Sequence, residues 1–125
     1  DLNFWASTGH ELEVLNQITA DELYDRYLRA EVEIIDVRNQ NEYDESHIPG
    51  ALKIQAGQLS DHLDRIPANK PVVLHCLSGD RSAVAASYLL SQGYDNIINL
   101  TGGIRCWWEA DFPVERAGTS QLITA

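Results

Sequence analysis

Along the chain, short apolar runs typical of strands alternate with segments whose apolar residues recur at helical spacing. Short apolar runs, typical of buried strands in a parallel sheet, occur at residues 32–37, 51–54, 71–76 and 96–100. Helical spacing of apolar residues predicts helices at residues 19–30, 59–66, 82–92 and 103–110. Leu12 to Leu15 predict an additional edge strand, and residues 39–50 form a turn-rich stretch.

Two of these helices carry signals for where they begin or end. Thr19 and Glu22 match a capping box, and Ile18 and Leu23 are spaced for a hydrophobic staple. Gly93 follows the third predicted helix and is expected to cap it. These signals support the helix assignments independently of the apolar spacing.

Strands that are joined through helices indicate an α/β domain. The expected architecture is an open central parallel β-sheet of about five strands, flanked by helices on both faces. In such sheets, ligands bind beyond the carboxyl ends of the strands. The most apolar strand ends at Cys76, so the chemistry is expected there.

Cys76 is followed by a loop that connects its strand to the next helix. The backbone N–H groups of this loop are expected to converge above Cys76 and, with the helix dipole, to form an anion-binding nest. A thiol in such a nest should have a lowered pKa and be a thiolate at neutral pH. Gly79 would supply the backbone conformation that the turn needs, and Arg81 a permanent positive charge near the rim. Cys76, as the nucleophile, and Arg81 are the expected catalytic residues. The expected substrate-binding loop comprises Leu77, Ser78, Gly79, Asp80, Arg81 and Ser82.

Two other interpretations of this region are less favoured. Free cysteines are often buried and inert, but the strand–loop–helix context of Cys76 argues against that interpretation. His75 is not expected to act as a base for Cys76, because adjacent strand residues point to opposite faces. It is expected to be packed or hydrogen-bonded beneath the sheet. No spacing of His, Cys and Asp residues resembles a metal site, and we expect no metal.

Composition narrows the possible functions. The 125 residues are expected to form one domain, and 44% hydrophobic with 22% charged residues is typical of a globular protein. The net charge of −10 excludes generic nucleic-acid binding and disfavours anionic membrane surfaces. Two cysteines are too few for a disulfide scaffold or a four-cysteine zinc site. With no apolar run of about 18 residues and no secretion signal, a cytoplasmic location is expected.

Three segments of the sequence resemble the rhodanese domain, the sulfurtransferase family. Residues 34–51 contain the runs IIDVR, EY and HIPGA, residues 72–82 read VVLHCLSGDRS, and residues 100–114 begin with LTGGI. Cys76 stands at the position of the family's persulfide-forming cysteine. Together the three segments span most of the chain, so the resemblance implies a rhodanese-like domain over residues 14–116.

The resemblance implies a two-step reaction at Cys76 that needs no metal or organic cofactor. The thiolate takes a sulfane sulfur from thiosulfate or a glutathione-type persulfide, and the resulting persulfide passes it to cyanide or a thiol. A covalent intermediate divides the transfer, and the amide nest would stabilise the anionic sulfur. Asp36 and Arg38 match positions near the family's active site and are expected to form a charge-assisted structural network. His47 and Pro49-Gly50 are expected to shape a turn.

Four residues depart from the family pattern. Ser46 and Asp111 stand where Gly is common, and Asp tolerates the left-handed conformation better than most residues. Cys106 stands where Ala is frequent, and we expect it to be a small core residue beside Trp107, with a resolving thiol as the alternative. Asp80 places a carboxylate inside the anion-binding loop. We expect it to weaken capture of dianionic thiosulfate relative to glutathione-type persulfides.

Two further functions remain as alternatives. The domain is either an enzyme in its own right or a persulfide relay or regulatory module of a larger protein, with an adjacent domain of the same chain as its partner. Cysteine phosphatase or arsenate reductase activity is less favoured. That chemistry needs a loop wide enough for a tetrahedral oxyanion, whereas only four residues separate Cys76 from Arg81.

The two ends of the chain are expected to lie outside this domain. Residues 117–125 are expected to be a C-terminal tail, and residues 1–13 an N-terminal flank or linker. Because the first residue is Asp1 rather than Met, we expect the chain to have been processed or cut from a longer protein. Trp5 to Glu13 align without gaps on Trp107 to Glu115. Residues 1–13 are therefore either the tail of an upstream rhodanese-like repeat or a flank that packs on the domain.

Overall fold

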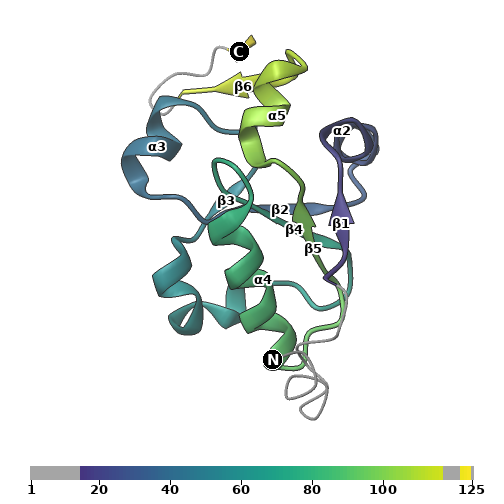
Figure 1. The fold of residues 1–125 in the computed structure, drawn as a ribbon, viewed down its shortest axis with the longest axis vertical. Helices are drawn as coiled ribbons and strands as arrows, with labels where there is room; N and C mark the ends of the chain where they lie inside the picture. The colour runs from purple at the N-terminus through teal and green to yellow at the C-terminus, as the bar shows by residue number, and fades with distance from the viewer. Residues whose placement is uncertain (1–14, 117–121, 125) are drawn as a thin grey trace, which may run out of the picture.

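Five short parallel strands form the centre of the fold (Figure 1). The computed structural model describes residues 15–116 and 122–124. The strand order is β1-β5-β4-β2-β3, and all four pairings are parallel, which confirms the predicted open parallel sheet. The strands are β1 (Gln17–Ile18), β2 (Glu33–Asp36), β3 (Leu52–Lys53), β4 (Val72–His75) and β5 (Ile97–Leu100).

Helices cover both faces of this sheet, as predicted. The helices of the described residues are α2 (Ala20–Leu28), α3 (Gln40–Glu45), α4 (Asp80–Ser91), α5 (Gly103–Glu109) and the 3₁₀ helices η1 (Ala56–Asp61) and η2 (Leu63–Arg65). One apolar core lies between the sheet and α4 with η1, and a second lies between the sheet and α2 with α5. Two covered faces explain why the strand runs of the sequence are apolar at consecutive positions.

The central strands show this two-sided burial directly. Ile34 of β2 pairs with Val73 of β4, and both belong to the core beneath α2 and α5. The next pair along, Ile35 and Leu74, belongs to the core beneath α4. All four side chains are buried, and each contributes about 1.5–3 kcal/mol by leaving water. β4 is therefore a rigid central element, and it ends immediately before Cys76.

The predicted capping signals are present. The backbone N–H of Thr19 donates to Glu22 Oε1 at 3.0 Å, and the N–H of Glu22 donates to Thr19 Oγ1 at 3.2 Å. Ile18 and Leu23 are buried in the same core, as a hydrophobic staple requires. Gly93 follows the last residues of α4 with a φ of +97°, which is the left-handed position that ends many helices.

The sequence predicts a turn where the structure has helix α3. Asn39 caps the helix, and Glu42 completes a second capping box: each accepts the other's backbone N–H, at 2.9 and 3.1 Å. Asn is favoured both in turns and at helix N-caps, so the residue type alone did not distinguish the two. Glu42, three residues after Asn39, is the feature that distinguishes a helix start from a turn here, because it completes a capping box.

Three other boundaries differ from the prediction. The edge strand of the described residues is Gln17–Ile18, and Leu15 lies outside it; the rest of the predicted strand at Leu12–Leu15 lies outside the described residues. Helix α4 begins at Asp80, two residues earlier than predicted, because Gly79 in the left-handed conformation already forms its N-cap. Residues 59–66 form parts of two 3₁₀ helices instead of one α-helix, because the backbone at His62 departs from helical geometry.

A two-stranded antiparallel sheet follows α5. It pairs β6 (Pro113–Glu115) with β7 (Leu122–Thr124), so the segment expected to be a C-terminal tail contains a strand. Glu115 also exchanges backbone hydrogen bonds of 2.9 and 3.0 Å with His47, which joins this sheet to the turn after α3. The proposed N-terminal flank, residues 1–13, lies outside the described residues. Among residues 15–116 and 122–124, every helix is too short or too polar to cross a bilayer.

Candidate active site

Cys76 lies at the carboxyl end of β4, the strand at the centre of the sheet. The neighbouring strands β2 and β5 end beside it, so the loop that begins at Cys76 is supported from both sides. The residue is 1% exposed. Its position is the one expected for ligand chemistry in an open parallel sheet.

Three donors of the loop and of the first turn of α4 surround the sulfur atom. Sγ of Cys76 accepts hydrogen bonds from the backbone N–H of Gly79 at 3.1 Å, the N–H of Ser82 at 3.4 Å and the hydroxyl of Ser82 at 3.4 Å. Burial raises the pKa of this thiol, but hydrogen bonds from Ser82, Gly79 and Ser78 outweigh it, so the pKa lies below its usual value. The predicted amide nest is thus formed around the sulfur itself.

Gly79 makes the nest possible through its backbone. Its φ is +110°, in a region that side chains resist. A Cβ added there would also lie 3.4 Å from the backbone nitrogen of Gly102. This confirms the conformational role that the sequence predicted for Gly79, and it places the turn between β5 and α5 against the loop.

The start of α5 holds the loop from the other side. The backbone N–H of Ile104 donates to the carbonyl oxygen of Cys76 at 2.9 Å, and that of Arg105 donates to Leu77 O at 3.1 Å. Gly103 permits this approach, because a Cβ there would lie 2.4 Å from Leu77 O and 2.6 Å from Cys76 O. From the sequence, Gly102-Gly103 contributed only to the family resemblance and had no assigned function. Two consecutive glycines one residue after a strand were the available sequence signal for this close backbone approach.

A buried charged network lies at the ends of β2 and β4. Nε of Arg38 donates to Asp36 Oδ1 at 2.9 Å, Nη2 donates to Oδ2 at 2.7 Å, and Nη2 also reaches the carbonyl oxygen of Ser46. Asp36 is 0% and Arg38 1% exposed. Burial raises the pKa of Asp36, but the charge of His75 and the hydrogen bonds and charge of Arg38 lower it to below its usual value. The expected charge-assisted structural network is therefore present.

His75 belongs to the same network and does not contact the sulfur. Its Nδ1 lies 3.1 Å from the carbonyl oxygen of Cys76, which requires a proton on Nδ1, and its Nε2 lies 3.6 Å from Asp36 Oδ2. Burial lowers the pKa of His75, while the carboxylate of Asp36 acts in the opposite direction. The predicted position beneath the sheet is confirmed.

Arg81 is paired with a residue from a distant helix. Its Nη1 and Nη2 donate to Glu42 Oε1 and Oε2, both at 3.1 Å. Its side chain is 44% exposed, as expected for a cation at the rim. Of the remaining loop residues, Leu77 is half-buried, whereas Ser78 and Asp80 are exposed. Arg81 and Glu42 are 39 positions apart, so no local pattern predicts their pairing, and the sequence-based expectations did not connect them.

Three of the four residues that depart from the family pattern have structural explanations. Asp111 has a φ of +59°, which confirms that the position needs the left-handed conformation. Ser46 Oγ accepts a hydrogen bond of 3.0 Å from the indole of Trp108. Cys106 is half-buried, and its Sγ fills the space beside Gly102, 2.2 Å from where a Cβ of Gly102 would lie. The packing role predicted for Cys106 agrees with this position.

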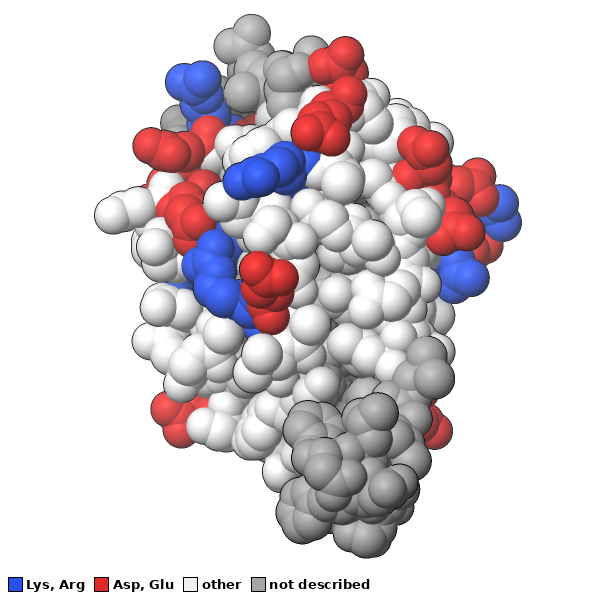
Figure 2. Space-filling view, viewed as in Figure 1, with Lys and Arg blue, Asp and Glu red and all other residues white. Residues whose placement is uncertain are grey.

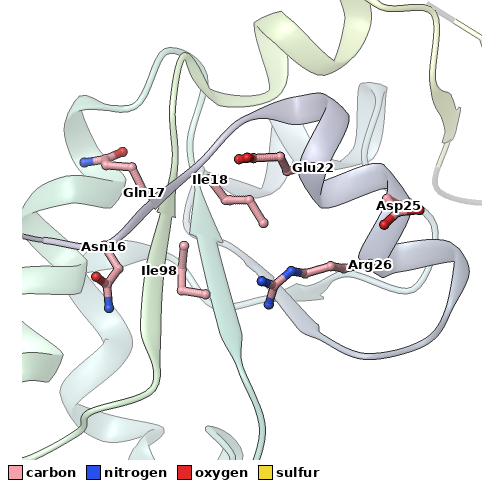
Figure 3. A pocket seen from close by; sticks show the side chains of 7 residues that line it. All are labelled: Asn16, Gln17, Ile18, Glu22, Asp25, Arg26 and Ile98. Atoms are coloured by element: carbon pink, nitrogen blue, oxygen red, sulfur yellow. The ribbon is translucent and has the colours of Figure 1, made fainter.

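Neither the face shown in Figure 2 nor a cavity beside β1 provides a second centre for this chemistry among the described residues. Figure 2 shows acidic and basic side chains side by side around α3 and over α2, with no broad basic area on this face. A cavity of about 410 Å³ lies between β1 and α2 (Figure 3). It is lined by Asn16, Gln17, Ile18, Glu22, Asp25, Arg26 and Ile98. Cys76 is not among these residues, and none of them is a strong nucleophile.

Comparison with known proteins identifies the family of this chain. The family model of the rhodanese-like domain matches residues 19–110. The chain belongs to the rhodanese-like domain family. A protein named sulfurtransferase from Allochromatium vinosum is 34% identical over 102 residues, which cover 81% of this chain and 95% of that protein. The thiosulfate sulfurtransferase GlpE of Coxiella burnetii is 32% identical over 91 residues, covering 73% and 85% of the two chains.

Solved structures support the same assignment. The crystal structure of a rhodanese-related protein from Thermoplasma volcanium aligns with a TM-score of 0.74 and 29% identity, covering 80% of this chain and 97% of that one. The resemblance that the sequence motifs indicated is thus confirmed, as is the rhodanese-like fold. The names of the relatives support a sulfurtransferase of the rhodanese family.

Proposed function

We propose that this rhodanese-family domain transfers sulfane sulfur through a persulfide on Cys76. The Cys76 thiolate attacks the terminal sulfur of the donor, a new S–S bond forms, and the donor's own bond to that sulfur breaks. The electron pair of the broken bond leaves with sulfite, when the donor is thiosulfate, or with a thiolate, when it is a persulfide. In the second step cyanide or a thiol takes the terminal sulfur, and the Cys76 thiolate returns.

The hydrogen bonds to Sγ are the observation that carries this proposal. Gly79 and Ser82 direct three donors at one sulfur atom, which favours the thiolate over the thiol. After transfer, the same donors are placed to stabilise the negative charge of a persulfide. Both steps use only the side chain of Cys76 and these donors, so the proposal includes no metal or organic cofactor.

The charges around the loop favour a particular class of donor. Asp80 lies exposed at the first position of α4, and the whole chain carries a net charge of −10. Both repel dianions more strongly than donors with less charge beside the reacting sulfur, although salt screens the longer-range part. We therefore propose glutathione-type persulfides ahead of thiosulfate as donors, and a thiol as the cellular acceptor.

Phosphatase or arsenate reductase chemistry has less support. A tetrahedral oxyanion needs free N–H donors around its oxygens, whereas Gly79 and Ser82 already direct their N–H groups to the Cys76 sulfur. Arg81, which would be the cation for such an anion, is held by Glu42. This arrangement suits a single sulfur atom better than a group of oxygens.

Cyanide-dependent thiocyanate formation tests the proposal. The wild-type protein is expected to form thiocyanate from glutathione persulfide and, more slowly, from thiosulfate, and Cys76→Ser is expected to form none. Mass spectrometry after donor treatment should show one added sulfur atom on Cys76. If the added sulfur is found but cyanide turnover is absent, the relay module with an adjacent domain as partner becomes the better proposal. Equal inactivity of both proteins, without added sulfur, contradicts the function.

A further inference from the structure

The carboxylate of Glu42 contacts Arg81 of the proposed substrate-binding loop, although it comes from helix α3, outside the loop. Both of its oxygens accept from Arg81, each at 3.1 Å. A bidentate pair of this kind is among the stronger ionic contacts between side chains, because two parallel hydrogen bonds accompany the charge attraction. Arg81 therefore does not present a free guanidinium to an approaching donor.

Glu42 is fixed in place by its own helix. It is the third residue of α3, and its Oε1 also accepts the backbone N–H of Asn39 at 3.1 Å, as part of the capping box. The hydrogen bonds from Arg81 lower the pKa of Glu42, partial burial raises it, and the bond from Asn39 lowers it further. The pKa of Glu42 therefore lies below its usual value. The carboxylate is thus anionic and in position before any donor arrives.

This pairing determines the charge that a donor meets. Arg38 is buried and bound to Asp36, so Arg81 is the guanidinium of the loop that remains near the surface. Glu42 offsets its charge, and Asp80 adds an exposed carboxylate. These three side chains together carry a net negative charge, and the N–H donors around Cys76 are the attraction that the loop itself keeps for an anion.

We propose that Glu42 is a specificity-determining residue that selects against donors with an oxyanion group attached to the transferred sulfur. This inference rests on the proposed sulfur transfer at Cys76. Thiosulfate carries its oxygens on the atom next to the sulfane sulfur, so these oxygens must compete with Glu42 for Arg81. In glutathione persulfide the atom next to the sulfane sulfur carries a neutral methylene group instead of oxygens, and the carboxylates are several bonds away. Such a donor delivers its sulfur to Cys76 without disturbing the Glu42–Arg81 pair.

The substitution Glu42→Gln tests this inference with little structural change. Gln also completes a capping box at this position of a helix, so the start of α3 is retained while the charge on Arg81 is released. We expect kcat/KM for thiosulfate to rise about fivefold, mainly through KM, which is the effect of freeing one partly exposed ion pair. The value for glutathione persulfide should change less than about twofold. Sulfate should also inhibit the persulfide reaction at lower concentrations.

Two further variants separate this effect from a change in net charge. Glu45→Gln removes the same charge from the exposed last residue of α3, which does not pair with Arg81. This variant should leave the ratio of kcat/KM for the two donors unchanged. The double variant Glu42→Gln/Arg81→Gln should lose the gain in thiosulfate activity. Equal increases in the Glu42 and Glu45 variants would overturn the inference, because they would show a general charge effect.

The failure of this inference differs from the failure of the proposed function. If the donor ratio of Glu42→Gln equals that of the wild type, while thiocyanate formation still depends on Cys76, Glu42 does not determine specificity and the sulfur transfer stands. If the wild-type protein shows no Cys76-dependent transfer from either donor, the proposed function itself is wrong.

Discussion

The hydroxyl of Ser82 lies 3.4 Å from Sγ of Cys76 and 3.2 Å from the carbonyl oxygen of Gly79. A hydroxyl has one proton, so it donates to only one of these acceptors at a time. A thiolate is the stronger acceptor, because hydrogen bonds to charged groups exceed those to neutral ones. Ionisation of Cys76 therefore draws this proton toward the sulfur, and Ser82 couples the charge of the nucleophile to the geometry of the loop.

The first prediction follows from this contact. Ser82→Ala removes the hydroxyl donor and should raise the pKa of Cys76, so that the pH profile of thiol alkylation shifts to higher pH. Below the pKa, where the thiolate is the minor form, we expect alkylation by iodoacetamide to be about fivefold slower, the worth of one hydrogen bond. Ser87→Ala, an exposed position on the same helix, should match the wild type. An unshifted profile in Ser82→Ala would show that the backbone donors alone set the pKa.

The second prediction concerns Asp80. Asp80→Asn removes a carboxylate from the loop itself and should raise kcat/KM for thiosulfate about two- to threefold, because an exposed charge contributes less than about 1 kcal/mol. The gain should shrink as salt is added, since screening weakens the repulsion that the variant relieves. Steady-state kinetics at low and high ionic strength with both donors provide the measurement. An unchanged preference between thiosulfate and glutathione persulfide would contradict the role of Asp80.

The central part of this site could be predicted from the sequence because it is formed locally. The apolar run of β4 leads directly into the loop, and the donors to Cys76 come from residues within six positions of it, Gly79 and Ser82. The first N–H groups of a helix have no partner within the helix, so in a short strand-to-helix loop they point back toward the end of the strand. The parallel sheet followed from the same runs, because apolar residues at consecutive positions need cover on both faces.

The rest of the site depends on contacts between distant parts of the chain. Glu42 and Arg81 are 39 positions apart, and no local sequence pattern around either residue predicts which residue it pairs with. The hold of α5 on the loop likewise joins Ile104 to Cys76 through backbone groups, which every residue carries. Edge strand β1 has only two residues, one of them the exposed Gln17, so its apolar signal is too weak to predict a strand at that position.

The third prediction concerns the buried pair of Asp36 and Arg38. Asp36→Asn leaves a guanidinium buried without its counter-charge and should lower the free energy of unfolding by about 3 kcal/mol at neutral pH. Because the pKa of Asp36 is lower in the folded than in the unfolded protein, its stabilisation is present above the unfolded value and is lost as the pH falls through the folded value. The difference between wild type and variant should therefore shrink in acid.

Urea unfolding between neutral and acidic pH provides the test of this pair. Asp25→Asn serves as the control, since Asp25 forms an ion pair with Arg29 that is more than half exposed and should contribute less than about 1 kcal/mol. A loss in Asp36→Asn no larger than in this control would show that the buried network does not support the fold.

The fourth prediction separates backbone conformation from close contact at two glycines. Gly50 has a φ of +86° and open space around it, whereas Gly103 has a φ of +66°, and a Cβ added there would lie 2.4 Å from the backbone oxygen of Leu77. Gly50→Ala should cost about 1–2 kcal/mol, the penalty of the left-handed conformation. Gly103→Ala should cost about 4 kcal/mol or more and reduce Cys76-dependent activity. Gly57→Ala, with neither constraint, should stay within about 0.5 kcal/mol; equal losses at Gly50 and Gly103 would contradict the contact with the loop.

Ala30 ends helix α2 in a conformation that a glycine would adopt more easily. Its φ is +57°, and the N–H groups of Ala30 and Glu31 donate to the carbonyl oxygens of Tyr27 and Arg26, which together make the Schellman motif. Because the side chain is exposed, Ala30→Gly loses no packing and should raise the free energy of unfolding by about 0.5–1 kcal/mol, after the entropy of the unfolded chain is included. Ala110→Gly, exposed and with a φ of −87°, should instead be neutral or destabilising. Thermal and urea unfolding of the two variants measure this difference, and a loss of stability in Ala30→Gly would mean that the strain at Ala30 is already relieved by its surroundings.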